Sequence, residues 1–138
     1  MASSSPDTTR TERDSMGEIE VPADALWGAG TQRAVENFPI SGRPLDAAVC
    51  RMLALVKWAA ARKNAELRVV PNELTELIER AAREVHEGRH DEHFVVDVFQ
   101  TGSGTSTNMN VNDVIANRCS QLRGEALDPL DAEHKIDV

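Results

Sequence analysis

The chain has 138 residues, of which 41% are hydrophobic and 28% charged, a length and composition that suit one globular domain. Its net charge of −8, without a basic stripe, excludes nucleic acid as an expected partner, because neutralising phosphates requires clustered cations. The most apolar segment, residues 45–61, contains Asp46, Arg51 and Lys57, and the first ten residues lack the apolar region of a signal peptide. We therefore expect a cytoplasmic protein with no membrane association.

The N-terminal third of the chain has an irregular texture. Residues 1–11 are rich in Ser, Thr and charged side chains, so we predict a disordered lead-in there and one folded domain over residues 12–138. Between Arg13 and Pro44 there are four Gly and three Pro. Because these residues favour turns, short extended pieces such as Gly17–Val21 and a helical turn near Thr31–Asn37 suit this segment better than a long helix.

Three helices are predicted after this segment. The first begins after Pro44, the second follows Pro71 and closes at Gly88, and the third runs from Ser106 or Thr107 to Gly124. Apolar residues recur in them at helical spacing: Leu45, Val49, Met52, Leu53, Val56 and Ala60; Leu74, Leu77, Ile78, Ala81 and Val85; Met109, Val114, Ile115, Cys119 and Leu122. The fold class is therefore predicted to be mainly α, with an irregular, partly extended N-terminal segment.

The two cysteines and the two tryptophans are interpreted as packing residues. Cys50 and Cys119 lie far apart in apolar, periodic stretches, which is typical of buried thiols in a reducing compartment and not of a disulfide or a metal pair. Trp27 and Trp58 are most simply explained as parts of the core.

A group of histidines near the end of the second helix resembles a metal cluster. It combines His86, His90 and His93 with Asp91 and Glu92. The helix is predicted to end at Gly88, between the first two histidines, and no further ligand group stands out elsewhere. We interpret the group as a solvated, charged helix terminus and predict no metal site.

The segment "VFQTGSGTSTNMNVNDV" at residues 98–114 places glycines and hydroxyl residues directly before the third helix. Two interpretations are open on physical grounds. The unpaired N–H groups of a helix start, together with small hydroxyl donors, can bind a carboxylate or a phosphate. Alternatively, Ser106 or Thr107 caps the helix and the glycines form a tight turn. The segment is neither a P-loop nor a dinucleotide fingerprint, because the Gly-Lys-Ser/Thr ending and the third glycine are missing.

Two longer segments carry a family resemblance. "RDSMGEIEVPADALWGAGTQRAVENFPISG" and "VDVFQTGSGTSTNMNVNDVIANR" together resemble the N-terminal part of class II fumarases, the iron-independent fumarate hydratases of the fumarase/aspartase superfamily. The resemblance runs from about Arg13 to Arg118. Gly102 and Ser103 favour a fumarase, since the related aspartases typically carry Gly-Ala at this point.

The resemblance implies a role for the glycine-rich loop. Ser103, Gly104 and Thr105 are expected to contact a carboxylate of the four-carbon substrate, with Thr101 and Asn108 shaping the same region. The implied reaction is the reversible hydration of fumarate to L-malate in the tricarboxylic acid cycle. The family forms homotetramers with active sites shared between subunits, and it uses neither a metal nor an organic cofactor.

The chain also departs from the family pattern. Gly30 and Val95 replace a usual Gln and Pro, and Asp137 stands where a His of a second dicarboxylate site is usual. The segments that carry the catalytic acid and base, and the central helical bundle, are not found in the sequence. We therefore expect an N-terminal domain truncated at its C-terminal end, with no catalytic residue of its own and no activity alone.

Two alternatives remain open. The chain could be a non-catalytic interaction module that docks on a full-length fumarase, or part of an aspartase-type ammonia lyase. An apolar surface on the three helices that faces the missing bundle would then be exposed, which predicts association or poor solubility.

Overall fold

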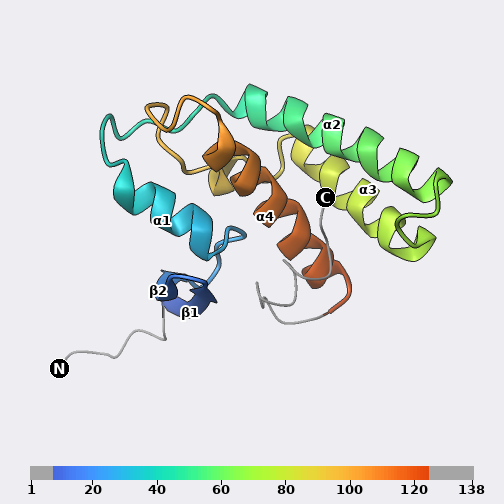
Figure 1. Ribbon diagram of the computed structural model, residues 1–138, viewed down its shortest axis with the longest axis horizontal. Coiled ribbons are helices and arrows are strands. Elements are labelled where there is room, and N and C mark those ends of the chain that lie inside the picture. The colour runs from blue at the N-terminus through green and yellow to red at the C-terminus, as the bar shows by residue number, and fades with distance from the viewer. Residues whose placement is uncertain (1–7, 125–138) are drawn as a thin grey trace.

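A computed structural model describes residues 8–124 (Figure 1). The elements, in chain order, are β1 (Thr9–Asp14), β2 (Gly17–Pro22), α1 (Ala29–Asn37), α2 (Ala47–Glu66), α3 (Asn72–His86), a single 3-10 turn (Asp91–His93) and α4 (Thr105–Leu122). The predicted mainly α fold is confirmed, as are the three long helices. No helix within this range is both long and apolar enough to cross a membrane. The expectations that concern Asp137 and the chain end lie outside the described residues.

The N-terminal hairpin corrects one prediction. β1 and β2 pair antiparallel, with Asp14 opposite Gly17 at the turn, so residues 9–11 belong to a strand and not to a disordered lead-in. Polar contacts hold this strand: the Arg10 guanidinium donates to four backbone carbonyls between Pro22 and Trp27, and the Thr9 hydroxyl donates to Glu20 at 2.8 Å. The sequence of β1 has no apolar alternation, so it lacks the pattern that predicts a strand.

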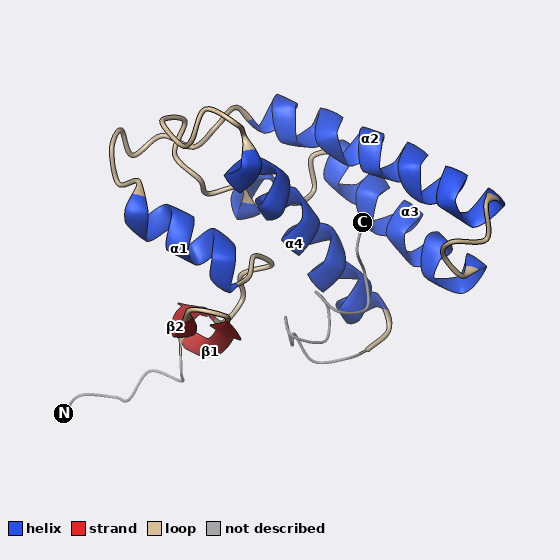
Figure 2. Cartoon of the chain, in the orientation of Figure 1, coloured by secondary structure: helices blue, strands red, loops and turns tan. Residues whose placement is uncertain are grey.

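The core lies where three helices meet. α3 returns alongside α2, and α4 packs across both of them (Figure 2). Many of the buried residues at this junction are small, which allows the helices to approach closely: Cys50, Ala54, Ala61, Ala81, Ala82, Ala116 and Cys119. The larger side chains Ile78, Val114 and Ile115 fill the remaining space, and each is at most 2% exposed.

The predicted apolar faces of α3 and α4 are confirmed, whereas that of α2 points mostly outward. Val49, Met52 and Val56 are 45%, 54% and 64% exposed, and α2 instead buries Cys50 and Ala54 against its neighbours. α2 is apolar on more than one side, so helical spacing alone could not tell which side packs.

Both cysteines are buried and free, as predicted. Burial raises the pKa of the Cys50 thiol to about 11 and that of Cys119 to about 12, so neither is a ready thiolate. Trp58 packs against the core, and the Arg83 guanidinium lies 5.1 Å from the centre of its ring. Trp27 is half-buried and donates its indole N–H to Gln32 at 2.9 Å.

α4 also carries a buried polar stripe, formed by Asn110, Asp113 and Asn117. Asn110 accepts the Val95 N–H at 3.1 Å and donates to the His93 carbonyl at 2.9 Å. Asp113 accepts the Gly28 N–H at 2.8 Å, and Asn117 donates to the Leu26 carbonyl at 2.7 Å. Positions separated by three and four residues share a helix face, so one face of α4 holds segments from two distant parts of the chain.

We expect Asn110→Ala to lower the free energy of unfolding by about 1–3 kcal/mol, because it leaves the part-buried N–H of Val95 and carbonyl of His93 without their partner. Urea unfolding followed by circular dichroism measures the change. Asn108→Ala, two residues away on the same helix but exposed, is the matched control and should stay within about 0.5 kcal/mol of the parent. Equal losses in both variants would contradict this role for Asn110.

Candidate functional site

Residues 101–105, which we call the hydroxyl loop, lead directly into α4. Gly104 occupies the position before the first helical residue with φ +73°, a left-handed conformation that favours glycine. Its N–H donates to the Thr101 carbonyl at 3.1 Å and closes a turn. The glycine therefore gives the chain the sharp entry into the helix that the loop requires.

Three hydroxyl groups line this loop in a row. The oxygens of Thr101 and Ser103 are 3.4 Å apart, and those of Ser103 and Thr105 are 3.0 Å apart. All three residues are exposed. Asn108 is exposed one turn along α4, three residues after Thr105, and so lies on the same face of the helix, although its side chain makes no hydrogen bond to the loop. The structure thus brings the predicted loop residues together and leaves Asn108 beside them.

The start of α4 adds backbone donors to these hydroxyls. The first N–H groups of any helix have no acceptor within the helix, and they lie at its partially positive end. Gly104 has no side chain with which to cap them. The Gln100 side chain accepts the N–H and the hydroxyl of Thr107, at 3.0 and 2.8 Å. Thr105, the first residue of α4, is exposed and carries the last hydroxyl of the row, so its own N–H is the helix-start donor nearest to that row, whereas Ser106 is buried.

Two residues that the sequence analysis did not select hold the base of the loop. Besides capping α4, Gln100 donates from its side-chain nitrogen to the Asp97 carbonyl at 3.2 Å. The Asp97 carboxylate accepts the N–H groups of Ser41, Gly42 and Phe99 at 2.8–2.9 Å. No local sequence signal identifies these contacts, since Asp97 and Ser41 are 56 residues apart.

These contacts also set the charge of Asp97. Burial opposes its ionisation, but the hydrogen bonds from Phe99, Ser41 and Gly42 outweigh burial and hold the pKa of the carboxyl below its ordinary value. Two backbone hydrogen bonds reinforce the junction, from Leu45 to Val96 at 3.1 Å and from Val98 to Arg43 at 2.9 Å. The segment before the loop, residues 96–100, is therefore held by several hydrogen bonds.

The hydroxyl loop itself is open to solvent. A methyl group added to Gly102 would meet nothing within 4 Å. A cavity of about 450 Å³ lies nearby and includes Phe38, Arg43 and Asp97 in its walls, but no residue of the loop lines it. The loop is thus one wall of a site that the described residues do not enclose.

The hydroxyl loop is suited to binding an anion and not to nucleophilic catalysis. Its donors are hydroxyl and amide groups, which hold an anion without needing a cation in an acidic protein. Within residues 8–124, the loop hydroxyls hydrogen-bond only to one another, so no imidazole, carboxylate or amine is positioned to activate them as nucleophiles.

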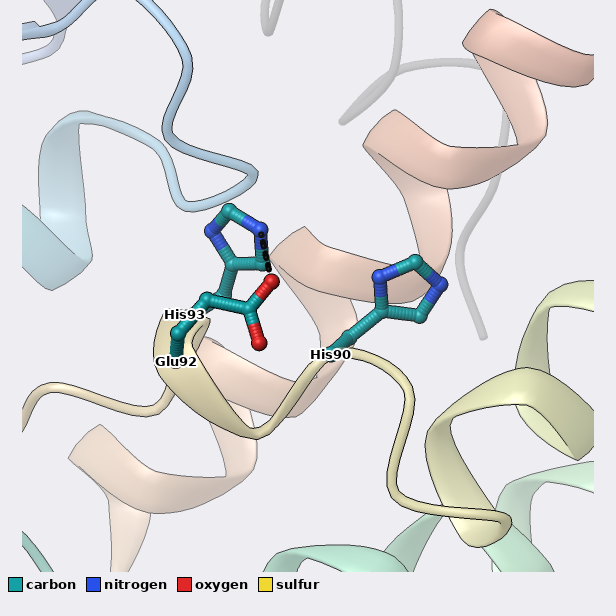
Figure 3. A group of neighbouring side chains, drawn as sticks. All are labelled: His90, Glu92 and His93. Atoms are coloured by element: carbon teal, nitrogen blue, oxygen red, sulfur yellow. Dashed lines mark ion pairs between the residues drawn. The ribbon is translucent and has the colours of Figure 1, made fainter.

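The histidine group is more buried than we predict. Figure 3 shows the carboxylate of Glu92 beside the ring of His93, with the ring of His90 next to them; candidate ligand atoms of the three lie within 4.8 Å of one another. The interpretation as a solvated terminus is wrong for the two histidines, whose side chains are each only 14% exposed. Tertiary contacts cover them: His90 donates to Glu84 at 2.9 Å, and the Leu26 N–H donates to Nδ1 of His93 at 3.2 Å.

The last of these contacts decides the tautomer of His93. Since Nδ1 accepts a hydrogen bond, the proton of the neutral ring is on Nε2, which faces Glu92 Oε1 at 3.3 Å. A metal bound through Nε2 would require the tautomer with its proton on Nδ1. The Nδ1–H would then point at the Leu26 N–H, so that two donors would face each other. The group therefore fits a hydrogen-bonded junction between the 3-10 turn and residue 26 better than it fits a metal ion.

Comparison with known proteins gives consistent matches. The family model described as a lyase matches residues 17–137. The chain is 58% identical over 118 residues to the class II fumarate hydratase of Halobacterium salinarum, and 60% identical over 116 residues to class II fumarate hydratase 1 of Pseudomonas aeruginosa. These alignments cover 86% and 84% of this chain but 25% of each relative, so the chain spans about a quarter of the length of the curated relatives it matches.

Solved structures agree with the sequence matches. A fumarate lyase of Brucella melitensis in its native form superimposes with a TM-score of 0.86 at 46% identity, over 92% of this chain and 30% of that one. A class II fumarase of Schistosoma mansoni superimposes with a TM-score of 0.83 at 40% identity, over 86% of this chain and 25% of that one. The resemblance to class II fumarases is confirmed.

We expect Gly104→Ala to lower the free energy of unfolding by about 1–2 kcal/mol, since a Cβ is disfavoured at φ +73°. Gly102→Ala is the matched control: it has no positive φ and open space around it, so its stability should not change. Thermal and urea unfolding measure both. A tolerated alanine at residue 104 would show that the left-handed entry into α4 is not required.

We expect the stability of the chain to fall as the pH drops from 7.5 to 5, through the unfolded pKa of histidine near 6.5. Burial lowers the pKa of His93 in the folded state, while the nearby Glu92 carboxylate opposes that shift and the neighbouring His90 adds to it. As the pH falls, His93 of the unfolded chain binds its proton before His93 of the folded chain does. The contribution of His93 to stability is therefore present above the unfolded pKa of about 6.5 and is lost as the pH falls below it.

The control for this pH dependence is His93→Asn, which keeps an acceptor for the Leu26 N–H but cannot titrate. Its unfolding free energy should vary less between pH 7.5 and 5. Glu84 does not interfere in this window: burial opposes its ionisation, but Arg118 and His90 outweigh burial and lower its pKa to about 2, so its contribution is lost only below pH 4.5. If the unfolding free energy of His93→Asn varied with pH as much as that of the parent, another group would be responsible for the pH dependence.

Proposed function

The chain belongs to the lyase family, and from this membership we propose that it forms the N-terminal, substrate-binding part of a cytoplasmic fumarate hydratase. The proposed reaction is the reversible hydration of fumarate to L-malate in the tricarboxylic acid cycle. The chain would contribute the hydroxyl loop to an active site completed by other segments and other subunits of a homotetramer.

The observation that carries this proposal is the row of hydroxyls at the start of α4. Ser103 and Thr105 place two hydroxyl oxygens 3.0 Å apart, next to the first N–H groups of the helix. Together these donors suit the two oxygens of a single carboxylate, and charge-assisted hydrogen bonds of this kind are the stronger ones. Gly104 adds no side chain that could block access, and Gly102 has open space around it.

The role of the loop in the reaction follows from where charge develops. Removal of a proton from C3 of malate puts extra negative charge on the adjacent carboxylate, which becomes an enediolate-like dianion. Donors that are already in place stabilise this charge more than they stabilise the ground state. Gln100 and Asp97 would keep the loop in place while this charge forms, because both hold its base.

The same geometry explains why the chain is proposed to be inactive alone. The described residues place no acid or base against the loop hydroxyls, and the loop is an open wall. The acid and the base would come from segments beyond the quarter of the relatives' length that this chain spans.

We expect the purified chain to bind fumarate weakly at the hydroxyl loop and to show no hydration activity. Amide shifts of residues 102–106 during a fumarate titration measure binding, and loss of fumarate's ultraviolet absorbance measures turnover. Ser103→Ala should weaken binding by about 1–3 kcal/mol, roughly 5- to 150-fold, because a charge-assisted hydrogen bond is lost. Ser103→Thr, which keeps a hydroxyl, is the control and should retain most of the affinity.

Other results would contradict the proposal in distinct ways. If the amide shifts caused by fumarate were the same in Ser103→Ala as in the parent, the loop would not have the assigned role. Turnover that copurifies with the chain and falls in Ser103→Ala would show that acid and base lie within these residues. Tighter binding of L-aspartate than of fumarate would favour an aspartase-type lyase.

A further inference from the structure

Gln100 caps α4 from four residues before the helix-flanking glycine. Its side-chain oxygen accepts the N–H of Thr107 at 3.0 Å and the Thr107 hydroxyl at 2.8 Å, while its side-chain nitrogen donates to the Asp97 carbonyl at 3.2 Å. Thr107 is the third residue of α4, and Gly104, which precedes the helix, has no side chain for this role. Gln100 therefore does what the residue directly before a helix usually does.

The start of α4 differs in charge from the starts of the other α-helices within residues 8–124. The Asp46 carboxylate accepts the Ala48 N–H at the start of α2 at 2.9 Å, and the first turn of α3 contains Glu73. At the start of α1, the Asp113 carboxylate accepts the Gly28 N–H at 2.8 Å. The first turn of α4 contains no acidic residue, and a neutral amide caps it. The partially positive end of α4 is thus capped without a negative charge.

The position of this cap separates it from the hydroxyl loop. An Asp or Ser at residue 104 would direct its own oxygen at the helix start, where the substrate carboxylate is proposed to bind. Gln100 instead takes the N–H of Thr107, which is buried, whereas Thr105 is exposed and its hydroxyl lies 3.0 Å from that of Ser103. The cap and the candidate ligand therefore use different donors of the same helix end.

We propose that Gln100 is a positioning residue that keeps the start of α4 available to an anion, because it caps the helix without adding negative charge. This inference rests on the proposed function, which assigns the hydroxyl loop to a substrate carboxylate. A carboxylate in place of the amide would still accept both groups of Thr107. It would also offset the partial positive charge of the helix start and repel the substrate carboxylate.

Two variants separate charge from capping. Gln100→Glu keeps an acceptor for Thr107 and adds a charge, whereas Gln100→Met has a similar length but neither acceptor nor charge. We expect Gln100→Glu to unfold at a higher temperature than Gln100→Met, because it retains the cap. Fumarate affinity, measured from amide shifts of residues 102–106, should follow the opposite order, with Gln100→Glu roughly tenfold weaker than the parent. A merely structural role would rank the two variants alike in both measurements.

A thiol at the helix start tests the charge without any substrate. Thr105→Cys places a thiol beside the first N–H of α4, and the rate of its alkylation against pH gives its pKa. The buried Cys50 and Cys119 do not interfere, since their pKa values are about 11 and about 12. The pKa of the introduced thiol should lie below the ordinary value of about 8.5. Adding Gln100→Glu should raise it by roughly half a pH unit or more, whereas adding Gln100→Met should leave it low.

The outcomes separate this inference from the proposed function. If the pKa of the thiol were the same with Gln100→Glu as without it, or if Gln100→Met weakened fumarate binding as much as Gln100→Glu, the proposal for Gln100 would be overturned. If fumarate caused no amide shifts at residues 102–106 of the parent while the thiol responded as expected, the assignment of fumarate to the loop would fail. The role of Gln100 in keeping the helix start open to an anion would then still be supported.

Discussion

The buried polar face of α4 is the contact on which the rest of this structure depends. A helix with Asn110, Asp113 and Asn117 inside would be unstable if those groups lacked partners, since each buried polar atom must recover the hydrogen bonds it lost to water. They find partners in backbone groups of residues 26–28 and 93–95. The irregular segments are therefore ordered by α4, and they supply hydrogen-bond partners to Asn110, Asp113 and the amide nitrogen of Asn117, whose oxygen is left without a partner.

This arrangement has a consequence for the candidate site. The hydroxyl loop is the direct N-terminal continuation of α4, so whatever fixes the helix also fixes the direction in which the loop points. Asp97 and Gln100 then fix its base by side-chain contacts to residues 41–42 and to Thr107. The loop can remain open and lightly packed because its support lies beneath it. Under the proposed function, donors held in this way would not have to reorganise to bind a charged ligand.

The junction at His93 shows how the same residue types can serve a different purpose. Two histidines and a glutamate gathered in one turn meet the composition of a metal site. The Leu26 N–H nevertheless selects the tautomer of His93 in which the nitrogen facing Glu92 carries the proton. A single backbone contact from 67 residues away thus decides between ligand and structural residue.

Local features determined a large part of this protein from sequence alone: the three long helices, the buried faces of α3 and α4, and the small donors gathered at the start of α4 follow from helical spacing and from glycine and hydroxyl chemistry. Tertiary structure alone decided which side of α2 packs, that the polar segment at residues 9–14 is a strand, and that Gln100 and Asp97 support the loop. The physical reason is range. Helical spacing and turn chemistry act between near neighbours, whereas the contacts of Arg10 and Asp97 join residues that only the folded chain brings together.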